Sequence, residues 1–521
     1  MLMQNHLRLQ VFHCKQRKYN RSVLIGAYVA SSSIRINPKS AGEIIRPELY
    51  GHFAEHLGSC IDQGIWVGET SSIPNIGGIR SDVLDALRQL HPPVVRWPGG
   101  CYADDYHWED GIGPRGSRPR RVNLWWGQNI ETNAFGTHEF IQVCRTLGAE
   151  PYLAGNVASG TPRELRDWVE YCNFAGDSTL ARRRAENGSP TPFGVRYWGI
   201  GNEAWGCGGY FSPDEYAGQF RRFATFIREF SGAAPFLIAC GPDGNNLDWT
   251  RRFMEKLGSF SRIHGLAAHY YCGTAGPSAT EFSADQWYEL LEKALRIENL
   301  ICDQRELLDE FDPQRKIGLV LDEWGTWHLP TPGRNPAHLW QQNTLRDALV
   351  AALTLDTFNR NADKLVMANI AQTVNVLQAM ILTQDDKMIT TPTYHVFEMY
   401  RAHQRGQRVA CQIDAPSISF AAGDEKRTLP GLAGSCSLKG DWITLSVVNP
   451  HASLPVESAI DLESVTLADA TVTVLTHAEL NAHNTFENPN VLRPVVMPWE
   501  FSTRHVFPPA SVTVIRGRLT F

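Results

Sequence analysis

From about residue 49 to residue 400, short apolar runs that end in glycine or a polar residue alternate with longer amphipathic stretches. Runs rich in β-branched residues are typical of buried strands, and apolar residues three or four positions apart are typical of helices. Eight strands that alternate with helices predict an α/β fold, a (β/α)8 TIM barrel. The eight runs are 49–55, 94–100, 151–158, 197–205, 236–243, 266–271, 317–324 and 365–372.

Three of the intervening stretches carry clear helix signals. Residues 81–90 begin with a capping serine, Ser81, and have apolar residues on one face. Residues 212–230 place a serine at the N-cap and a proline at the first helical position. Residues 285–301 repeat the apolar spacing and are expected to form one helix.

The pattern of apolar and polar residues changes after about residue 400. There, short strand-like stretches in which apolar and polar residues roughly alternate are separated by Gly, Pro, Asn and Asp. This pattern predicts a C-terminal antiparallel β-sandwich domain. The strand-like stretch SSIRINP (32–38) precedes the barrel and can pair into that sandwich. We therefore expect a disordered N-terminal extension over 1–31, a strand segment over 32–48 that joins the sandwich, the catalytic barrel over 49–400 and the sandwich over 401–521.

The stretch LYGHFAEHLG (49–58) contains His-x-x-Glu-His, which matches a zinc-protease signature. That chemistry requires a helix, on which His52 and His56 would share one face. On a strand the two histidines lie about 13 Å apart, too far to bind one ion. Because this stretch begins the barrel as a strand, a metalloprotease is disfavoured, and Glu55 at the strand end is a candidate for other chemistry.

The composition of the chain limits the partners, the location and the cofactors that we expect. The 49 Lys and Arg against 55 Asp and Glu leave a net charge of -6, so we expect neither a nucleic acid nor a membrane as partner. Eleven cysteines without regular spacing make a disulfide framework unlikely and favour a reducing, cytoplasmic location. VLIGAYVASSS (23–33) weakly resembles the apolar part of a signal peptide, so secretion remains the alternative. No metal-ligand cluster or phosphate loop indicates a cofactor.

Two glutamates stand at the expected active-site edge of the barrel, where the strands end. GIGNEAWG places Glu203 at the end of the fourth strand, and LVLDEWG places Glu323 at the end of the seventh. Tryptophans, which stack on sugar rings, flank both. Either glutamate alone would usually be a solvated or ion-paired strand end. Together they predict glycoside hydrolysis, in which one carboxyl protonates the leaving oxygen and the other attacks the anomeric carbon or activates water.

Four motifs make the expectation more specific: YGHFAEHLG, RWPGGCYADDYHWEDGIGP, YWGIGNEAWGCGG and LDEWGTW. Together they resemble the family 51 glycoside hydrolases, the α-L-arabinofuranosidases, over about residues 33–521. The resemblance implies a retaining, exo-acting enzyme that releases terminal arabinofuranosyl groups from arabinan, arabinoxylan or derived oligosaccharides. It also implies a homo-oligomer, either a trimer or a hexamer.

The resemblance also implies roles for individual residues. Glu203 would be the acid/base and Glu323 the nucleophile. From the residues alone, His269 and Tyr271 could equally be core residues, Glu55 could only pair with Arg96, and Trp125 and Trp126 could build a subsite or pack under their loop. The substrate-binding residues that the resemblance implies are Glu55, Cys101, Asn202, His269, Tyr271 and Gln378.

Two other functions remain open. An enzyme of the same clan could cleave a β-glucan or a xyloside, because the two carboxylates do not distinguish these sugars. A degenerate barrel could also bind carbohydrate without catalysis. The presence of both glutamates with their neighbours argues against the second alternative.

Overall fold

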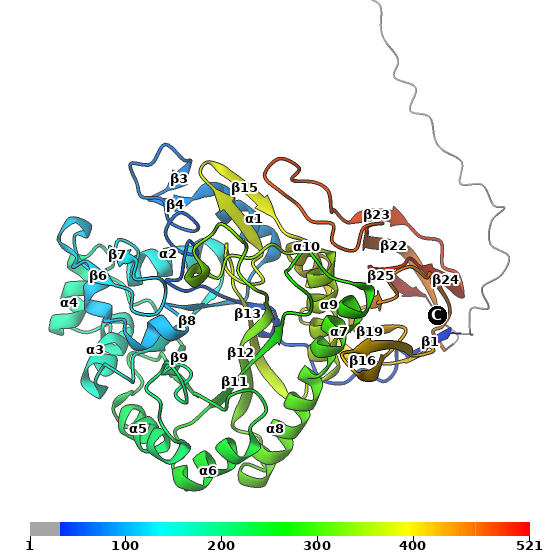
Figure 1. The fold of residues 1–521 in the computed structure, drawn as a ribbon. Coiled ribbons are helices and arrows are strands. Elements are labelled where there is room, and N and C mark those ends of the chain that lie inside the picture. Colours follow the sequence, from blue (N-terminus) through cyan, green and yellow to red (C-terminus); the bar gives the residue numbers. More distant parts are fainter. Residues whose placement is uncertain (1–31, 464, 521) are drawn as a thin grey trace, which may run out of the picture.

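The computed structural model describes residues 32–463 and 465–520, so the expected extension over 1–31 lies outside the described residues. Figure 1 shows a barrel ringed by helices, with a second, strand-rich body packed against one side of the ring. Among the described helices, none combines the length and apolar character that crossing a bilayer requires.

The eight predicted strands are all present, and they close into one parallel barrel. β2 pairs with both β5 and β13, which closes the ring between the first strand and the last. Buried residues that include Val94, Tyr197 and Met367 fill the interior below the site. The barrel strands are β2 (Gly51–Phe53), β5 (Val94–Trp97), β8 (Glu150–Gly155), β9 (Tyr197–Ile200), β10 (Phe236–Ala239), β11 (Gly265–Gly273), β12 (Gly318–Trp327) and β13 (Leu365–Ala371).

The outer ring confirms most of the helix predictions. Ser212 caps α5 through a reciprocal capping box with Glu215, although the helix ends at Phe226 because Ile227 is extended. Ser81 lies inside α1, whose N-cap is Arg80. The ring helices are α1 (Ser81–Leu90), α2 (Thr137–Leu147), α3 (Pro162–Asn173), α5 (Pro213–Phe226), α6 (Leu247–Leu257), α7 (Ala284–Leu295), α8 (Ile297–Phe311), α9 (Leu345–Arg360) and α10 (Pro392–Tyr400).

The expectation of one helix over 285–301 is wrong, because α7 and α8 meet at Arg296. The backbone N–H of Arg296 bonds to the carbonyl of Lys293, which tightens the chain at the junction. The buried stripe continues across the junction, from Leu291 and Ala294 to Ile297 and Ile301. Periodicity alone therefore does not reveal the break.

The C-terminal body is a sandwich of nine strands, and β1 (Ser32–Asn37) lies inside it. β1 pairs antiparallel with β16 (Gln407–Asp414) and parallel with β21 (Val456–Asp461), so one pair departs from the expected antiparallel pattern. The sandwich core includes Ile34 and Val447. The remaining strands are β19 (Ala433–Lys439), β20 (Trp442–Asn449), β22 (Thr466–Thr476), β23 (Val495–Pro498), β24 (Arg504–Phe507) and β25 (Ser511–Thr520).

Helix α9 joins the two bodies. Nearly all of its residues are buried, as expected for a helix with protein on every side. Asp356 on α9 accepts hydrogen bonds from Ser435 and Ser446 of the sandwich at 2.7 and 2.5 Å. In α7, the Trp287 indole donates to the carbonyl of Pro450 at 2.8 Å. These contacts fix the sandwich to the side of the ring.

Candidate active site

The fold brings Glu203 and Glu323 together, although 120 residues separate them in the chain (323 minus 203). One carboxyl oxygen of each lies within 4.8 Å of the other. Nδ1 of His269 lies between them, 2.8 Å from Glu203 Oε1 and 3.5 Å from Glu323 Oε2. Inverting glycosidases hold their carboxyls roughly 6.5–9.5 Å apart, whereas retaining enzymes hold them about 5 Å apart. The spacing therefore fits double displacement.

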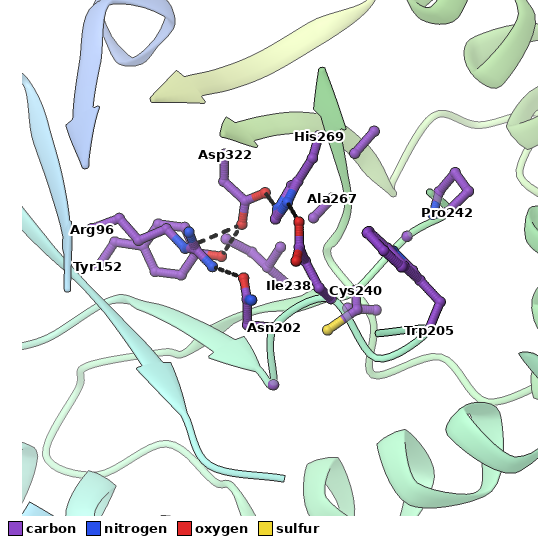
Figure 2. A pocket seen from close by; sticks show the side chains of 15 residues that line it. Arg96, Tyr152, Asn202, Trp205, Ile238, Cys240, Pro242, Ala267, His269 and Asp322 are labelled. Atoms are coloured by element: carbon purple, nitrogen blue, oxygen red, sulfur yellow. Dashed lines mark hydrogen bonds and ion pairs between the residues drawn. The ribbon is translucent and has the colours of Figure 1, made fainter. Parts of the chain in front are cut away.

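Arg96 on β5 contacts three side chains, two from β12 and one from the turn after β9. Its guanidinium donates to Glu323 Oε1 at 2.7 Å and to Asn202 Oδ1 at 2.6 Å, and its Nε lies 3.4 Å from Asp322 Oδ2. Figure 2 shows Arg96 facing Asp322 and Asn202. Glu55 is not its partner, so the simple Glu55–Arg96 pair considered from the sequence is not formed.

Tyr271 and His269 both reach the carboxylates rather than serving only the core. The Tyr271 hydroxyl donates to Glu323 Oε2 at 2.8 Å. Burial and the nearby charge of Glu323 raise the pKa of Tyr271 well above its ordinary value, so it remains a donor. Burial lowers the pKa of His269, but the charge of Glu323 and the hydrogen bonds to Asp322 and Glu203 outweigh it and hold that pKa well above its ordinary value.

The turn after β9 holds Glu203 in an unusual backbone conformation. Glu203 has φ of 37°, in the left-handed region that non-glycine residues rarely occupy. Such strain persists where the surrounding contacts enforce it, commonly at functional sites. Asp104 is one enforcing contact, because its Oδ2 accepts the backbone N–H of Asn202 at 2.7 Å. Gly208 is another, since a Cβ there would lie 1.7 Å from the carbonyl oxygen of Asn202.

Glu55 follows β2 and is 2% exposed. Its carboxyl accepts from the backbone N–H of Tyr102 at 3.0 Å, from Trp126 Nε1 at 2.9 Å and from Gln372 Nε2 at 3.1 Å. Burial, followed by the charge of Glu323, raises the pKa of Glu55 to about 7. Glu55 is therefore a carboxyl that can be neutral at physiological pH.

The structure does not favour Gln378 as a residue that faces the sugar. Its Oε1 accepts from Thr326 N at 2.8 Å, and its Nε2 donates to the carbonyl of Asp347 at 2.8 Å and to Thr393 at 3.2 Å. Both polar atoms of its amide are thus hydrogen-bonded to other groups of the protein. Gln372, at the end of β13, leaves a buried Oε1 without a hydrogen-bond partner, and its Nε2 contacts Glu55.

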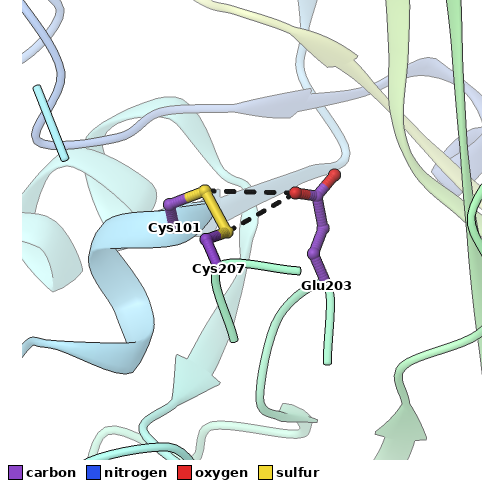
Figure 3. Close-up of side chains that lie close together, drawn as sticks. All are labelled: Cys101, Glu203 and Cys207. Atoms are coloured by element: carbon purple, nitrogen blue, oxygen red, sulfur yellow. Dashed lines mark hydrogen bonds between the residues drawn. A yellow bond between two sulfur atoms is a disulfide. The ribbon is translucent and has the colours of Figure 1, made fainter. Parts of the chain in front are cut away.

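Cys101 is joined to Cys207 in a disulfide beside Glu203 (Figure 3). The sulfurs lie 3.9 and 3.5 Å from Glu203 Oε2. Disulfide sulfurs carry no proton, so neither donates to that oxygen. Although a disulfide framework was not expected, this single bond forms, and the other eight cysteines of the described residues are free. Cys207 lies in the GCGG segment, whose spacing from Cys101 carries no pairing signal.

Aromatic residues surround the site in two roles. Trp198 and Trp324 are buried core residues. Trp126 holds Glu55, whereas Trp125 in the same loop is 40% exposed. Trp327 at the end of β12 packs edge-on against Tyr271, with ring centroids 5.1 Å apart.

A small cavity lies next to Glu203, and its lining includes Trp205, Cys240 and Pro242 (Figure 2). Glu55, Tyr271 and Glu323 do not line it. The cavity is therefore bordered by only one of the two glutamates, Glu203.

The metalloprotease alternative fails on geometry, because His52 lies on strand β2 and His56 follows in the loop after it, so no helix places the two on one face. His56 contacts Glu131 at 3.2 Å and accepts from Trp97 Nε1 at 3.2 Å. A closed barrel with two carboxylates at retaining distance across its mouth instead defines a retaining glycoside hydrolase.

Comparisons with known proteins identify the family. The family model of the α-L-arabinofuranosidase C-terminal domain matches residues 322–511, and the family model of the α-L-arabinofuranosidase 1 domain matches residues 86–274. The chain is 46% identical, over 89% of its length and 90% of the relative, to an intracellular exo-α-L-arabinofuranosidase of Bacteroides ovatus. This chain belongs to the family 51 α-L-arabinofuranosidases.

Solved structures agree with this assignment. The family 51 arabinofuranosidase of Xanthomonas axonopodis pv. citri is 39% identical with a TM-score of 0.89, over 94% of this chain and 100% of that one. The α-L-arabinofuranosidase of Thermotoga maritima, in an arabinose complex, is 32% identical with a TM-score of 0.83 over the same shares. Both cover the barrel and the sandwich.

The raised pKa of Glu55 predicts a pH dependence of stability. Glu55 has an ordinary pKa of 4.5 and a folded pKa of about 7, so folding favours its protonated form. Its contribution is complete below pH 4.5 and is lost as the pH rises through 7, on the order of 3 kcal/mol. Glu55→Gln mimics the neutral carboxyl, so it should melt near wild type at pH 5 and above wild type at pH 8.5. Melting temperatures of both proteins across this range test it; parallel curves would contradict the assignment.

Proposed function

We propose that this enzyme is a retaining exo-α-L-arabinofuranosidase in which Glu323 is the nucleophile and Glu203 the acid/base. The observation that carries the proposal is the spacing of the two carboxyls, within 4.8 Å at their nearer oxygens. Family membership supports the same activity.

In the first step an oxygen of Glu323 bonds to the anomeric carbon, and the bond from that carbon to the leaving oxygen breaks. Glu203 gives its proton to the leaving oxygen. In the second step Glu203 removes a proton from water, the water oxygen attacks the anomeric carbon, and the bond to Glu323 breaks. Arabinose leaves with its original configuration because two inversions cancel.

The surroundings suit these two roles. Glu323 accepts hydrogen bonds from the Arg96 guanidinium and the Tyr271 hydroxyl, which fix the position of the attacking carboxyl. Asn202 lies directly before Glu203 and is held by Arg96. Its amide is suited to the sugar 2-hydroxyl, a contact that strengthens in the oxocarbenium-like transition state.

We assign the remaining sugar contacts to Glu55, His269, Tyr271 and Gln372. Gln372 replaces Gln378 in this set because its Oε1 is buried and unpaired, and a sugar hydroxyl can satisfy it. The Cys101–Cys207 disulfide forms an apolar wall beside Glu203. Trp125, which is largely free of the core, is available for the group that follows the terminal sugar.

The substrate is an arabinose-containing oligo- or polysaccharide. Arabinan, arabinoxylan and their oligosaccharides all present terminal arabinofuranosyl groups that an exo-acting site can accept. The relative from Bacteroides ovatus is named intracellular, which supports a cytoplasmic location and therefore short, imported oligosaccharides. The assembly is a homo-oligomer, a trimer or a hexamer, which sedimentation velocity measures directly.

Removing either glutamate should separate their roles. Glu323→Ala should lower turnover at least about 10³-fold on every arabinofuranoside. Glu203→Ala should lose roughly 10²–10⁴-fold on natural oligosaccharides but far less on an aryl arabinofuranoside whose leaving group needs no proton. Initial rates on the two substrates measure the difference.

Azide provides the control, because it enters the site of the missing carboxylate. Glu323→Ala with azide should give an arabinosyl azide of inverted configuration, and Glu203→Ala with azide should give one of retained configuration. NMR of the products distinguishes them. The reverse pattern would exchange the two roles, and faster hydrolysis of aryl xyloside or glucoside than of arabinofuranoside would favour the other same-clan activities.

The two glutamines should also differ. Gln372→Ala should lower kcat/KM on aryl arabinofuranoside about 10-fold or more, because its unpaired Oε1 is assigned to a sugar hydroxyl. It should lower the melting temperature less than Gln378→Ala does, because its amide makes one described hydrogen bond, to Glu55. Gln378→Ala should mainly lower the melting temperature, because it breaks three internal hydrogen bonds. Steady-state kinetics and calorimetry on both variants test the assignment, and the opposite pattern would restore Gln378 to the sugar site.

A further inference from the structure

A third carboxylate lies beside the two catalytic candidates. Asp322 directly precedes Glu323 on β12, and neighbouring residues of a regular strand point to opposite faces. Here the pairing of β12 with β13 shifts between Leu321 and Trp324. Such an irregularity can re-aim a side chain. Both Asp322 and Glu323 consequently contact Arg96.

Asp322 is almost fully buried, at 2% exposure, and every contact of its carboxyl is internal. Oδ2 accepts from the Tyr152 hydroxyl at 2.7 Å, and Oδ1 lies 3.1 Å from His269 Nε2. In Figure 2 Asp322 stands between Arg96 and Tyr152 on one side and His269 on the other. Asp322 is therefore too enclosed to touch a sugar, but it contacts the histidine that touches Glu203.

The imidazole of His269 connects two carboxylates through its two nitrogens. Nε2 faces Asp322, and Nδ1 faces Glu203 Oε1 at 2.8 Å. Carboxylate oxygens only accept hydrogen bonds, so both contacts are satisfied at once when both ring nitrogens carry protons. The geometry thus favours the imidazolium form.

We propose that Asp322 is a positioning residue of the reaction. By accepting from Nε2 of His269 it keeps Nδ1 protonated and donating to Glu203 Oε1, so that the acid proton of Glu203 is carried on Oε2. This inference rests on the proposed role of Glu203 as acid/base.

The contacts of Glu203 Oε2 support this placement. The sulfurs of Cys101 and Cys207 are its described neighbours at 3.9 and 3.5 Å, and as a disulfide they have no proton to donate. Oε2 is thus the carboxyl oxygen without a fixed donor. A proton on Oε1 would instead face the proton of Nδ1.

The charges around the pair balance with that proton in place. Arg96 and the imidazolium supply two positive charges, and Asp322 and Glu323 supply two negative charges, which leaves Glu203 free to be neutral before the first step. Burial raises the pKa of Asp322, but Arg96 and His269 outweigh it and hold that pKa below its ordinary value. The titratable or charged groups that face His269 and Asp322 are Arg96, Tyr152, Glu203, Cys240, Tyr271 and Glu323.

Without Asp322 the histidine should become neutral. Nδ1 then becomes an acceptor that draws the Glu203 proton onto Oε1 and holds it away from the leaving oxygen. The loss of kcat should be large on substrates whose leaving group needs this proton. It should be small on aryl arabinofuranosides with activated leaving groups.

The test is Asp322→Asn. We expect kcat on an arabino-oligosaccharide to fall about 10–100-fold, with less than about 3-fold loss on an activated aryl arabinofuranoside. Removing the anion lowers the pKa of His269, so the loss of activity at alkaline pH should begin at least about one pH unit lower. ¹⁵N NMR of labelled histidine, with His269→Gln identifying the signals, should show imidazolium in wild type at pH 7 and neutral imidazole in Asp322→Asn.

Two further variants keep the test decisive. Tyr152→Phe removes one hydrogen bond to Asp322 but leaves the carboxylate, so it should give a smaller change in the same direction. Asp356→Asn makes the same chemical change at a buried aspartate between barrel and sandwich, and it should lower stability without moving the pH profile.

The outcomes separate this proposal from the function. Equal losses on both substrates with an unchanged pH profile would reduce Asp322 to a structural residue, and a neutral His269 in wild type would overturn the proposal. Neither result would disturb the roles of Glu203 and Glu323, which the alanine and azide experiments decide.

Discussion

The rest of the site depends on the contacts of one buried cation, the guanidinium of Arg96. It is 1% exposed and lies over the ring of Phe53, 4.7 Å from its centroid. A cation in this position is strongly destabilising unless anions and hydrogen-bond acceptors surround it. Asp322, Glu323 and Asn202 supply them, and the requirement to neutralise Arg96 therefore draws the ends of β9 and β12 toward β5.

Barrel closure makes this convergence possible. The site residues come from strand ends that are far apart in the chain, and only the ring brings them within hydrogen-bond distance. Local departures from regular structure then set the final directions. Glu203 occupies a left-handed conformation, and the pairing of β12 with β13 shifts between Leu321 and Trp324, across Asp322 and Glu323. The regular barrel brings the site residues close together, and these irregularities set the directions in which the side chains of Glu203 and Glu323 point.

Much of this architecture is predictable from the sequence, because buried strands and amphipathic helices leave periodic signals. The eight barrel strands and the capping residue Ser212 were found in this way. The break at Arg296 was not, because the apolar stripe runs through it. Family motifs indicated which segments form the site. They could not show which way each side chain turns.

The glutamines and cysteines show why the orientation of a side chain is harder to predict from the sequence than the position of a strand or helix. Gln372 and Gln378 are six residues apart in one irregular segment after β13 (378 minus 372), and only the surrounding donors and acceptors decide which amide is left open. Cys101 and Cys207 are 106 residues apart, and their contact depends on loops that follow different strands. Asp322 belongs to the same class, since a strand rule applied to LDEW would turn it away from Glu323.

The carboxyls of the site share one chemical group but differ in their surroundings. Burial raises the pKa values of Glu55 and Asp104 to about 7, whereas Arg96 and His269 hold the pKa of Asp322 low against burial. Environments that push such pKa values apart are the usual means of giving identical groups different tasks. Asp322 lies between Arg96 and His269 and is held as an anion, whereas Glu55 and Asp104 form no described ion pair and can carry protons.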